Sequence, residues 1–168
     1  MSDPTVLIMM GSDSDLTTME ETAAILTSFG VPFEMRISSA HRSPERTAKL
    51  AHEAAGRGIQ LIIAAAGMAA HLAGVIAAET MLPVIGVPMG GGPLSGMDAL
   101  YATVQMPGGI PVATMAIGKA GAKNAGLFAV QILSLGDPEL RVKFAEYRRQ
   151  MALEVEQKDA ALQAAMLR

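Results

Sequence analysis

TVLIMMGSDSDLTTMEETAAIL, residues 5–26, is the stretch that decides the fold. Its uninterrupted apolar run, Val6–Met10, predicts a strand that is buried on both faces. The run ends at GSDSD (11–15), and the apolar residues that follow recur at the spacing of a helix. The stretch therefore predicts a buried strand that turns directly into a helix of about 15–29, which is the first unit of an α/β fold.

Further apolar runs repeat this pattern along the chain. The expected strands lie at Phe33–Ser38, Gln60–Ala65, Val84–Val87 and Val112–Ala116. The sequence between successive runs is long enough for one helix in each case. Because strands alternate with helices and read as nearly continuous apolar segments, we expect a parallel five-stranded sheet with helices on both faces.

The helices are predicted from apolar periodicity and from start and stop signals. One helix is expected to begin at Ser43-Pro44 and to end at Gly56. Others are expected near 69–80, 95–105 and 118–135. Asp137-Pro138 begins a last helix of about 138–160, which carries an apolar stripe and is followed by no strand. We expect one catalytic domain over residues 1–168, with this last helix covering the sheet or packing on a neighbouring subunit.

The composition restricts the class of protein. The chain is 51% hydrophobic and only 17% charged, yet no apolar block reaches membrane-spanning length, so the surplus apolar surface predicts a homo-oligomer and no membrane partner. A net charge of −3 and 4% aromatic residues argue against nucleic-acid binding. The chain has no cysteine, which excludes disulfides, thiol nucleophiles and cysteine metal sites. No signal-peptide pattern precedes the first strand, so we expect a cytoplasmic protein.

Four unusual loops follow predicted strands. They are GSDSD (11–15), SSAHRSP (38–44), AAGMAAHLAG (65–74) and PMGGGPLSGMD (88–98). In an open parallel sheet, ligands bind beyond the carboxyl ends of the strands, where these loops would gather. We therefore expect a ligand site at this edge of the sheet.

The first loop suits an anion. Gly11 allows close backbone approach, Ser12 and Ser14 supply hydroxyls, and the helix that follows offers free amides at its N-terminus. Asp15 could accept hydrogen bonds from sugar hydroxyls. The alternative is that Ser14 or Asp15 simply caps the helix.

The second loop carries candidate chemistry. Arg42 can bind a phosphate with two parallel hydrogen bonds, and Ser39 and Ser43 add hydroxyl donors. His41 can exchange protons near neutral pH, as general acid–base catalysis requires. The alternative is a surface loop with incidental charges ahead of a capped helix.

The third and fourth loops are built from small residues. In residues 65–74, His71 is the only ionisable group, and the small side chains allow backbone amides to approach a ligand while water is excluded. Close helix–sheet packing is an equally good interpretation of this loop. The glycine-rich loop 88–98 could form a lid or the rim of a neighbouring subunit's site. Dinucleotide, Walker and H-E-x-x-H zinc signatures do not occur, so no metal is expected.

Six motifs then occur in a familiar order. They are GSDSD, SAHRSP, GMAAHLAGVIAAET, PVIGVPM, LSGMDALYATVQMPGGIPVAT and AIGKAGAKNAG. Together, from about Val6 to Gln131, the chain resembles the 5-(carboxyamino)imidazole ribonucleotide mutase family of purine biosynthesis, of the bacterial class I type. The resemblance implies a flavodoxin-like three-layer α/β/α sandwich, a homo-octamer with active sites at subunit contacts, and no metal or organic cofactor.

The resemblance also implies an activity and a set of site residues. The family converts 5-carboxyamino-1-(5-phospho-D-ribosyl)imidazole into 5-amino-1-(5-phospho-D-ribosyl)imidazole-4-carboxylate. Ser12 and Arg42 match its phosphate-binding positions, Asp15 its ribose-binding position and His41 its catalytic histidine. Gly67–His71 matches the loop around the base and its carboxylate. The expected substrate-binding set is Gly11, Ser12, Ser14, Asp15, Ser39, Ala40, Arg42, Gly67, Met68, Ala69, Ala70 and Leu72, with His41 and His71 as catalytic candidates.

Two departures from the family pattern stand out. Met68 occupies a position where relatives usually have glycine, and Met89-Gly90-Gly91-Gly92 replaces bulkier polar residues. The first could reshape the base pocket, and the second could loosen a lid.

Two alternative functions remain open. One is a carboxylase of the same superfamily, which adds free carbon dioxide to the aminoimidazole ribonucleotide. The other is a non-catalytic flavodoxin-like module that binds FMN or another nucleotide. The absence of tryptophan argues against flavin binding.

Overall fold

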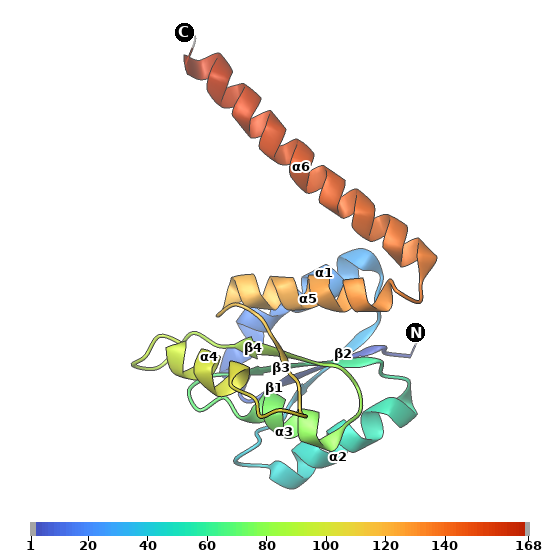
Figure 1. Ribbon diagram of the computed structural model, residues 1–168, viewed down its shortest axis with the longest axis vertical. Coiled ribbons are helices and arrows are strands. Elements are labelled where there is room, and N and C mark those ends of the chain that lie inside the picture. Colours follow the sequence, from blue (N-terminus) through green and yellow to red (C-terminus); the bar gives the residue numbers. More distant parts are fainter. Residues whose placement is uncertain (1–2, 167–168) are drawn as a thin grey trace. The chain divides into compact units, whose positions relative to one another are not determined.

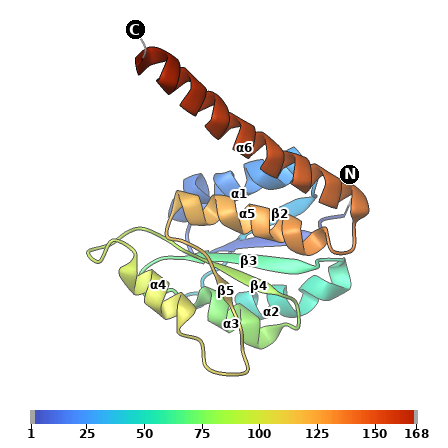
Figure 2. The same ribbon diagram turned by 45° about the horizontal axis from the view of Figure 1, so that its top comes forward.

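The computed structural model describes residues 3–166 and contains a five-stranded parallel sheet (Figures 1 and 2). The strands are β1 (Val6–Met10), β2 (Phe33–Ile37), β3 (Leu61–Ala66), β4 (Val84–Pro88) and β5 (Ala113–Thr114). Their order across the sheet is β2-β1-β3-β4-β5. This is the order of flavodoxin-like folds. The predicted fold class is therefore confirmed.

The helices form a layer on each face of the sheet (Figures 1 and 2). On one face lie α1 (Leu16–Phe29) and α5 (Lys119–Leu133); on the other lie α2 (Pro44–Ala54), α3 (Leu72–Glu79) and α4 (Met97–Val104). The Thr22 hydroxyl of α1 donates to the Ala122 carbonyl of α5 at 2.7 Å. This buried hydrogen bond ties together the two helices of the first layer.

The central strands are buried on both faces, as the apolar runs predicted. Every residue of β1 is buried, and its side chains alternate between the two layers. Leu7 and Met9 pack in one core cluster with Ile62 of β3 and Ile76 of α3. This buried sheet is the rigid base from which the strand-end loops project.

β5 is shorter than the predicted strand of 112–116. Only Ala113 and Thr114 pair with β4, because this is an edge strand and Pro111, which has no backbone N–H, comes before it. The chain still follows β4 beyond the strand. The Met115 amide donates to the Gly86 carbonyl at 2.8 Å, and the Gly118 amide donates to the Pro88 carbonyl at 2.9 Å.

Two predicted helix boundaries were wrong. α2 ends at Ala54 and passes into a 3-10 turn, Ala55–Arg57, which stops at Gly58 with a φ of 87° rather than at Gly56. α3 begins at Leu72 rather than near 69. The Ala70 amide donates to the Met68 carbonyl at 2.9 Å, and this tight turn precedes the helix.

The chain divides into two compact units, one ending at Ala129 and the other beginning at Val130. The second unit contains α6 (Pro138–Met166), which is longer than the predicted 138–160. Asp137 caps this helix, since its Oδ1 accepts from the Glu139 and Leu140 amides at 3.0 Å each. The helix continues beyond Asp159 because alanine, leucine and glutamine, which follow there, are strong helix formers.

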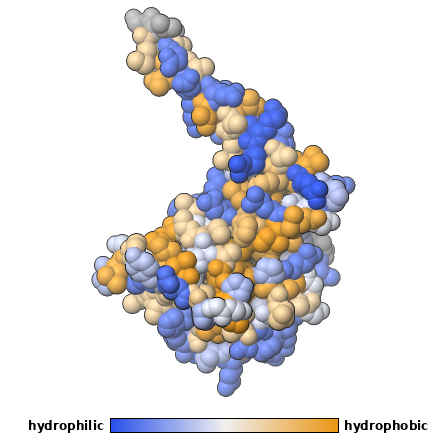
Figure 3. Space-filling view, viewed as in Figure 1, coloured by the Kyte–Doolittle hydropathy of each residue, from blue (hydrophilic) through white to orange (hydrophobic). Residues whose placement is uncertain are grey.

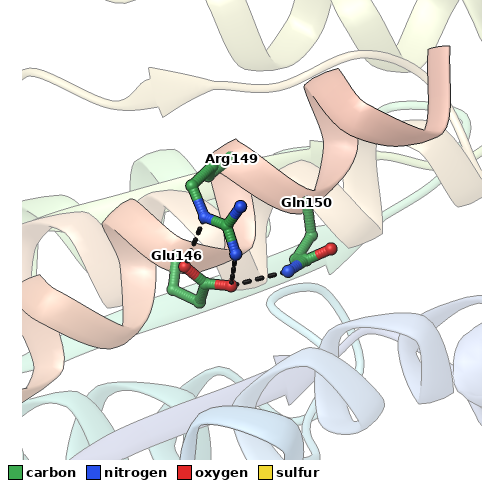
Figure 4. A network of polar contacts seen from close by, with 3 residues as sticks. All are labelled: Glu146, Arg149 and Gln150. Atoms are coloured by element: carbon green, nitrogen blue, oxygen red, sulfur yellow. Dashed lines mark hydrogen bonds and ion pairs between the residues drawn. The ribbon is translucent and has the colours of Figure 1, made fainter. Parts of the chain in front are cut away.

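Polar contacts along α6 join side chains one turn apart (Figure 4). Glu146 accepts two hydrogen bonds from Arg149, at 2.8 and 2.7 Å, and a third from Gln150 at 2.6 Å. The bonds from Arg149 and then Gln150 lower the pKa of the Glu146 carboxyl to about 2. Among the described residues, no helix combines the length and the apolar character needed to cross a membrane.

One glycine in α5 provides a test of this packing. A Cβ added to Gly121 would lie 1.6 Å from the Ala116 carbonyl oxygen, which is backbone and cannot move away cheaply. We expect Gly121→Ala to lower the free energy of unfolding by about 3 kcal/mol or more, the upper range for overpacking. Urea denaturation measures this change. The matched control is Gly56→Ala, since a Cβ there meets nothing within 4 Å; equal stability of the two variants would contradict the packing.

Candidate active site

A cleft of about 670 Å³ opens at the carboxyl edge of the sheet. It is lined by the loops that follow β1, β2, β3 and β4, which are neighbours in the sheet. The lining residues are Gly11, Ser12, Ser14, Asp15, Ser39, Ala40, His41, Arg42, Ala66, Gly67, Met68, Ala69, His71, Leu72, Met89, Gly90, Gly91 and Gly92. The cleft therefore lies at the edge where the sequence predicted a ligand site.

The structure brings nearly all predicted site residues together around this cleft. Ala70 is the exception, because its side chain is buried (1% exposed) and does not line the cleft. Sequence reasoning left Ala66, Met89 and Gly90–Gly92 out of the site. The glycines after β4 were a usable signal, since they had suggested a lid at the same sheet edge.

The loop after β1 begins with a 3-10 turn, Asp13–Asp15. Ser12 caps this turn: its Oγ accepts from the Ser14 amide at 3.3 Å and donates to Asp13 Oδ1 at 3.1 Å. The alternative in which Ser14 or Asp15 caps α1 was wrong, since Asp15 at the N-cap position makes no side-chain cap hydrogen bond. Because the 3-10 turn precedes α1, the side-chain cap is made by Ser12 at the start of that turn. The Asp15 carboxylate makes no cap hydrogen bond and is available to a ligand.

The pKa of the Asp15 carboxyl in the cleft is displaced upward. Desolvation raises the pKa of its carboxyl above the ordinary 3.8; hydrogen bonds from Ser12 and Ser14 oppose this shift, and the charge of Asp13 adds to it. A carboxylate held in this state gains from a ligand that donates hydrogen bonds to it, as sugar hydroxyls do.

This pKa shift predicts a pH-dependent gain in stability for Asp15→Asn. In the unliganded fold the ionised carboxylate is disfavoured, so it destabilises the protein above the folded pKa and costs nothing below 3.8. At pH 7 we expect the variant to be more stable by less than about 1 kcal/mol, because solvent screens a half-buried group. The gain should disappear by pH 3.5.

Urea denaturation at the two pH values measures this effect. Asp159→Asn, which removes an exposed carboxylate on α6, is the control and should change stability at neither pH. An Asp15→Asn protein that is less stable than the parent at pH 7 would contradict the prediction.

The loop after β2 is held by its own serines. Ser39 Oγ accepts from the Arg42 amide at 3.2 Å, while Ser43 Oγ accepts from the Ser39 amide and donates to its carbonyl, both at 3.1 Å. These bonds fix the turn that presents His41 and Arg42. The Arg42 guanidinium reaches the first loop, where its Nη2 donates to the Gly11 carbonyl at 3.2 Å. A cation from one loop and the Ser12–Asp15 turn of another thus meet in one cleft.

His41 and His71 are in direct contact although they come from different loops. His41 Nε2 lies 2.8 Å from His71 Nδ1, and the two rings meet edge to face with centroids 4.9 Å apart. One nitrogen of this contact must donate and the other accept, so the pair shares a proton between two exposed imidazoles. The contact fixes the orientation of the two rings relative to each other at the cleft.

The remaining wall of the cleft is apolar and comes from the loops after β3 and β4. It contains Gly67, Met68, Ala69, Leu72 and Met89. Among residues 3–166, no group of three or more His, Asp or Glu side chains is placed to hold a metal ion. The site therefore combines an arginine and serine hydroxyls at one end, a pair of histidines in contact and an apolar wall.

A parallel sheet of this order with polar strand-end loops around one cleft defines a flavodoxin-like α/β protein with a ligand-sized cleft at the carboxyl edge of its sheet. Comparison with known proteins narrows this class. The family model for AIR carboxylase matches residues 5–154, and the chain belongs to this family.

The relatives extend over nearly the whole chain. The N5-carboxyaminoimidazole ribonucleotide mutase of Pyrococcus horikoshii is 54% identical over 95% of this chain and 89% of its own length. The protein of the same name from Synechocystis sp. is 55% identical over 95% of this chain and 90% of its own. The crystal structure of Treponema denticola PurE has a TM-score of 0.86 at 32% identity and covers 95% of this chain and 98% of its own. The resemblance inferred from the six motifs is confirmed.

Proposed function

We propose that this protein is an enzyme of purine biosynthesis, a mutase that converts 5-carboxyamino-1-(5-phospho-D-ribosyl)imidazole into 5-amino-1-(5-phospho-D-ribosyl)imidazole-4-carboxylate. The observation that carries the proposal is 54–55% identity, over 95% of the chain, to proteins named for that activity. The cleft supports it with the groups that such a reaction needs.

The ends of the cleft suit the two ends of a ribonucleotide. Arg42 and Ser12 bind the phosphate, which replaces the Gly11 carbonyl as the partner of the guanidinium. Asp15 accepts from the ribose hydroxyls. The loop Gly67–His71 and the adjoining Ala40 and Leu72 surround the imidazole and its carboxylate.

The reaction moves one carboxylate and consumes no net proton. The carbamate N–C bond breaks, carbon dioxide is released, and the nitrogen takes a proton. The ring carbon of the aminoimidazole then attacks the retained carbon dioxide, a C–C bond forms, and the ring carbon loses its proton. Because carbon dioxide stays beside the ring, the second step avoids a bimolecular encounter with the dissolved gas.

His41 is the residue we assign to both proton transfers. It gives a proton to the nitrogen as the carbamate breaks and takes one from the ring carbon after attack, which returns it to its starting state. His71, at 2.8 Å, holds the His41 ring in one orientation and in one protonation pattern. In this assignment His71 acts through His41 and not on the substrate.

We further propose a cytoplasmic homo-octamer in which residues 1–168 form one catalytic domain and α6 packs on a neighbouring subunit. Exposed apolar side chains support self-association. Met97, Tyr101 and Val104 lie at helical spacing on α4, and Leu94 lies in the turn before it; all four side chains are exposed. Figure 3 shows apolar side chains on this side of the molecule. The octamer count follows from the family resemblance. A monomeric mass in solution would contradict this assembly.

An assay with two substrates distinguishes the mutase from the carboxylase. Purified protein is incubated with the carbamate ribonucleotide or with the aminoimidazole ribonucleotide, each with and without bicarbonate. Turnover of the carbamate that does not require bicarbonate supports the mutase. Efficient carboxylation of the aminoimidazole that requires bicarbonate would support the carboxylase, and inertness toward both would favour a non-catalytic binding module.

A further inference from the structure

Met68 has a backbone conformation that methionine rarely adopts. Its φ is +55°, in the left-handed region, and the residue lies two positions after the end of β3, where the chain turns toward His71. Such a conformation persists where the surrounding structure fixes it, and it is found more often at ligand sites than elsewhere. The side chain lines the cleft and is nevertheless 61% exposed.

The loop after β4 lines the same cleft as Met68 with three glycines, which have no side chains. Gly90, Gly91 and Gly92 follow β4 and line the same cleft. The two loops approach closely, since a Cβ on Gly92 would lie 3.6 Å from Met68 Cγ and a Cβ on Gly67 would lie 3.4 Å from Met89 Cβ. Met68 Cγ thus lies beside Gly92 in the lining of the cleft, where the three glycines place no side chain of their own.

We propose that Met68 is the residue that retains carbon dioxide in the cleft during the reaction. This inference rests on the proposed mutase function and assigns the apolar cover of the base pocket to one side chain. Methionine suits this role, because its long unbranched side chain adapts to the shape of a ligand. An exposed apolar side chain at the mouth of a cleft is also driven to cover a bound ring, since contact removes it from water.

The role of Met68 concerns a branch point in the reaction. After the carbamate N–C bond breaks and nitrogen is protonated, carbon dioxide either forms the C–C bond or leaves. If carbon dioxide forms the C–C bond, His41 takes back a proton from the ring carbon, and the reaction consumes no net proton. If it leaves, the products are aminoimidazole ribonucleotide and carbon dioxide, and one proton is taken from solvent. The ratio of these products therefore measures retention.

The experiment measures product partition for Met68→Gly. Carbamate ribonucleotide is turned over in ¹³C-bicarbonate with carbonic anhydrase present, and spontaneous decarboxylation without enzyme is subtracted. We expect the variant to release aminoimidazole ribonucleotide, and to incorporate ¹³C into the carboxylate product, at least about fivefold more per turnover than the parent, because an open site admits the side reaction. The variant should fold normally, since glycine adopts a positive φ without strain.

Two further variants separate retention from general damage. Met68→Leu keeps an unbranched Cβ and apolar volume and should restore the low partition ratio of the parent. Met81→Gly removes a methionine that is fully exposed outside the cleft and should leave partition unchanged.

The outcomes distinguish this inference from the proposed function. A parent protein that does not turn over the carbamate at all would overturn the mutase and the inference together. A parent that is active, with Met68→Gly partitioning as the parent does, would overturn the role of Met68 alone. An increase in release that Met68→Leu does not correct would also contradict it.

Discussion

Replacing His41 with asparagine should abolish nearly all turnover while the protein still binds its substrate. Asparagine can keep a hydrogen bond near the position of a ring nitrogen but cannot carry a proton at neutral pH. Loss of general acid–base catalysis typically lowers rates by ~10²–10⁴-fold. We therefore expect kcat to fall by about this factor. The dissociation constant of the carbamate ribonucleotide should change by less than about threefold, because the variant keeps the proposed phosphate and ribose contacts of Ser12, Asp15 and Arg42.

The matched control for this variant is His52→Asn. His52 lies on α2 outside the cleft, where it contacts Glu79 at 3.1 Å and the Ala48 carbonyl at 3.1 Å. Loss of its contacts should leave kcat unchanged. Steady-state kinetics and calorimetric titration give the two quantities. If His41→Asn retained near-parental kcat, the proton transfers would belong to another group.

Much of the fold was predictable because apolar runs in this chain coincide with buried strands. β1 was predicted to the residue, and β2, β3 and β4 to within one residue at each end. The side chains of β1, β3 and β4 are almost all buried, whereas those of β2 are half-buried or exposed. β5 was less predictable because only Ala113 and Thr114 pair with β4, and Pro111, which has no backbone N–H, comes shortly before them. The end of α6 was missed because its apolar stripe fades while helix propensity persists.

The position of the site could also be predicted, since parallel strands place their following loops at one edge of the sheet. The geometry within it could not. Residue types give no indication that His41 and His71, 30 positions apart, meet at 2.8 Å, because that distance depends on how two loops pack. The φ of Met68 was likewise not predictable, since neighbouring contacts and not the side chain impose it. The prediction that Ser14 or Asp15 caps α1 was wrong because a 3-10 turn, capped by Ser12, precedes this helix.

The second large effect is expected for Arg42→Ala, on substrate binding. Removing one partner of a charge-assisted contact costs about 2–5 kcal/mol, which corresponds to a KM raised by about 30-fold to 4,000-fold. Arg42→Lys should recover part of this loss, since it keeps the charge but not the planar fork. Arg46→Ala, an exposed arginine on α2 that does not line the cleft, is the matched control and should leave KM unchanged.

The contact between Arg42 and Gly11 requires one more comparison, because the guanidinium also joins two loops at 3.2 Å. A purely structural role would damage turnover of any substrate, whereas a phosphate contact matters only when phosphate is present. The parent and Arg42→Ala should therefore be compared on the ribonucleotide and on the matching riboside. We expect the large penalty on the ribonucleotide and almost none on the riboside. Equal penalties on both would assign Arg42 to holding the loops together, and the phosphate would then need another cation.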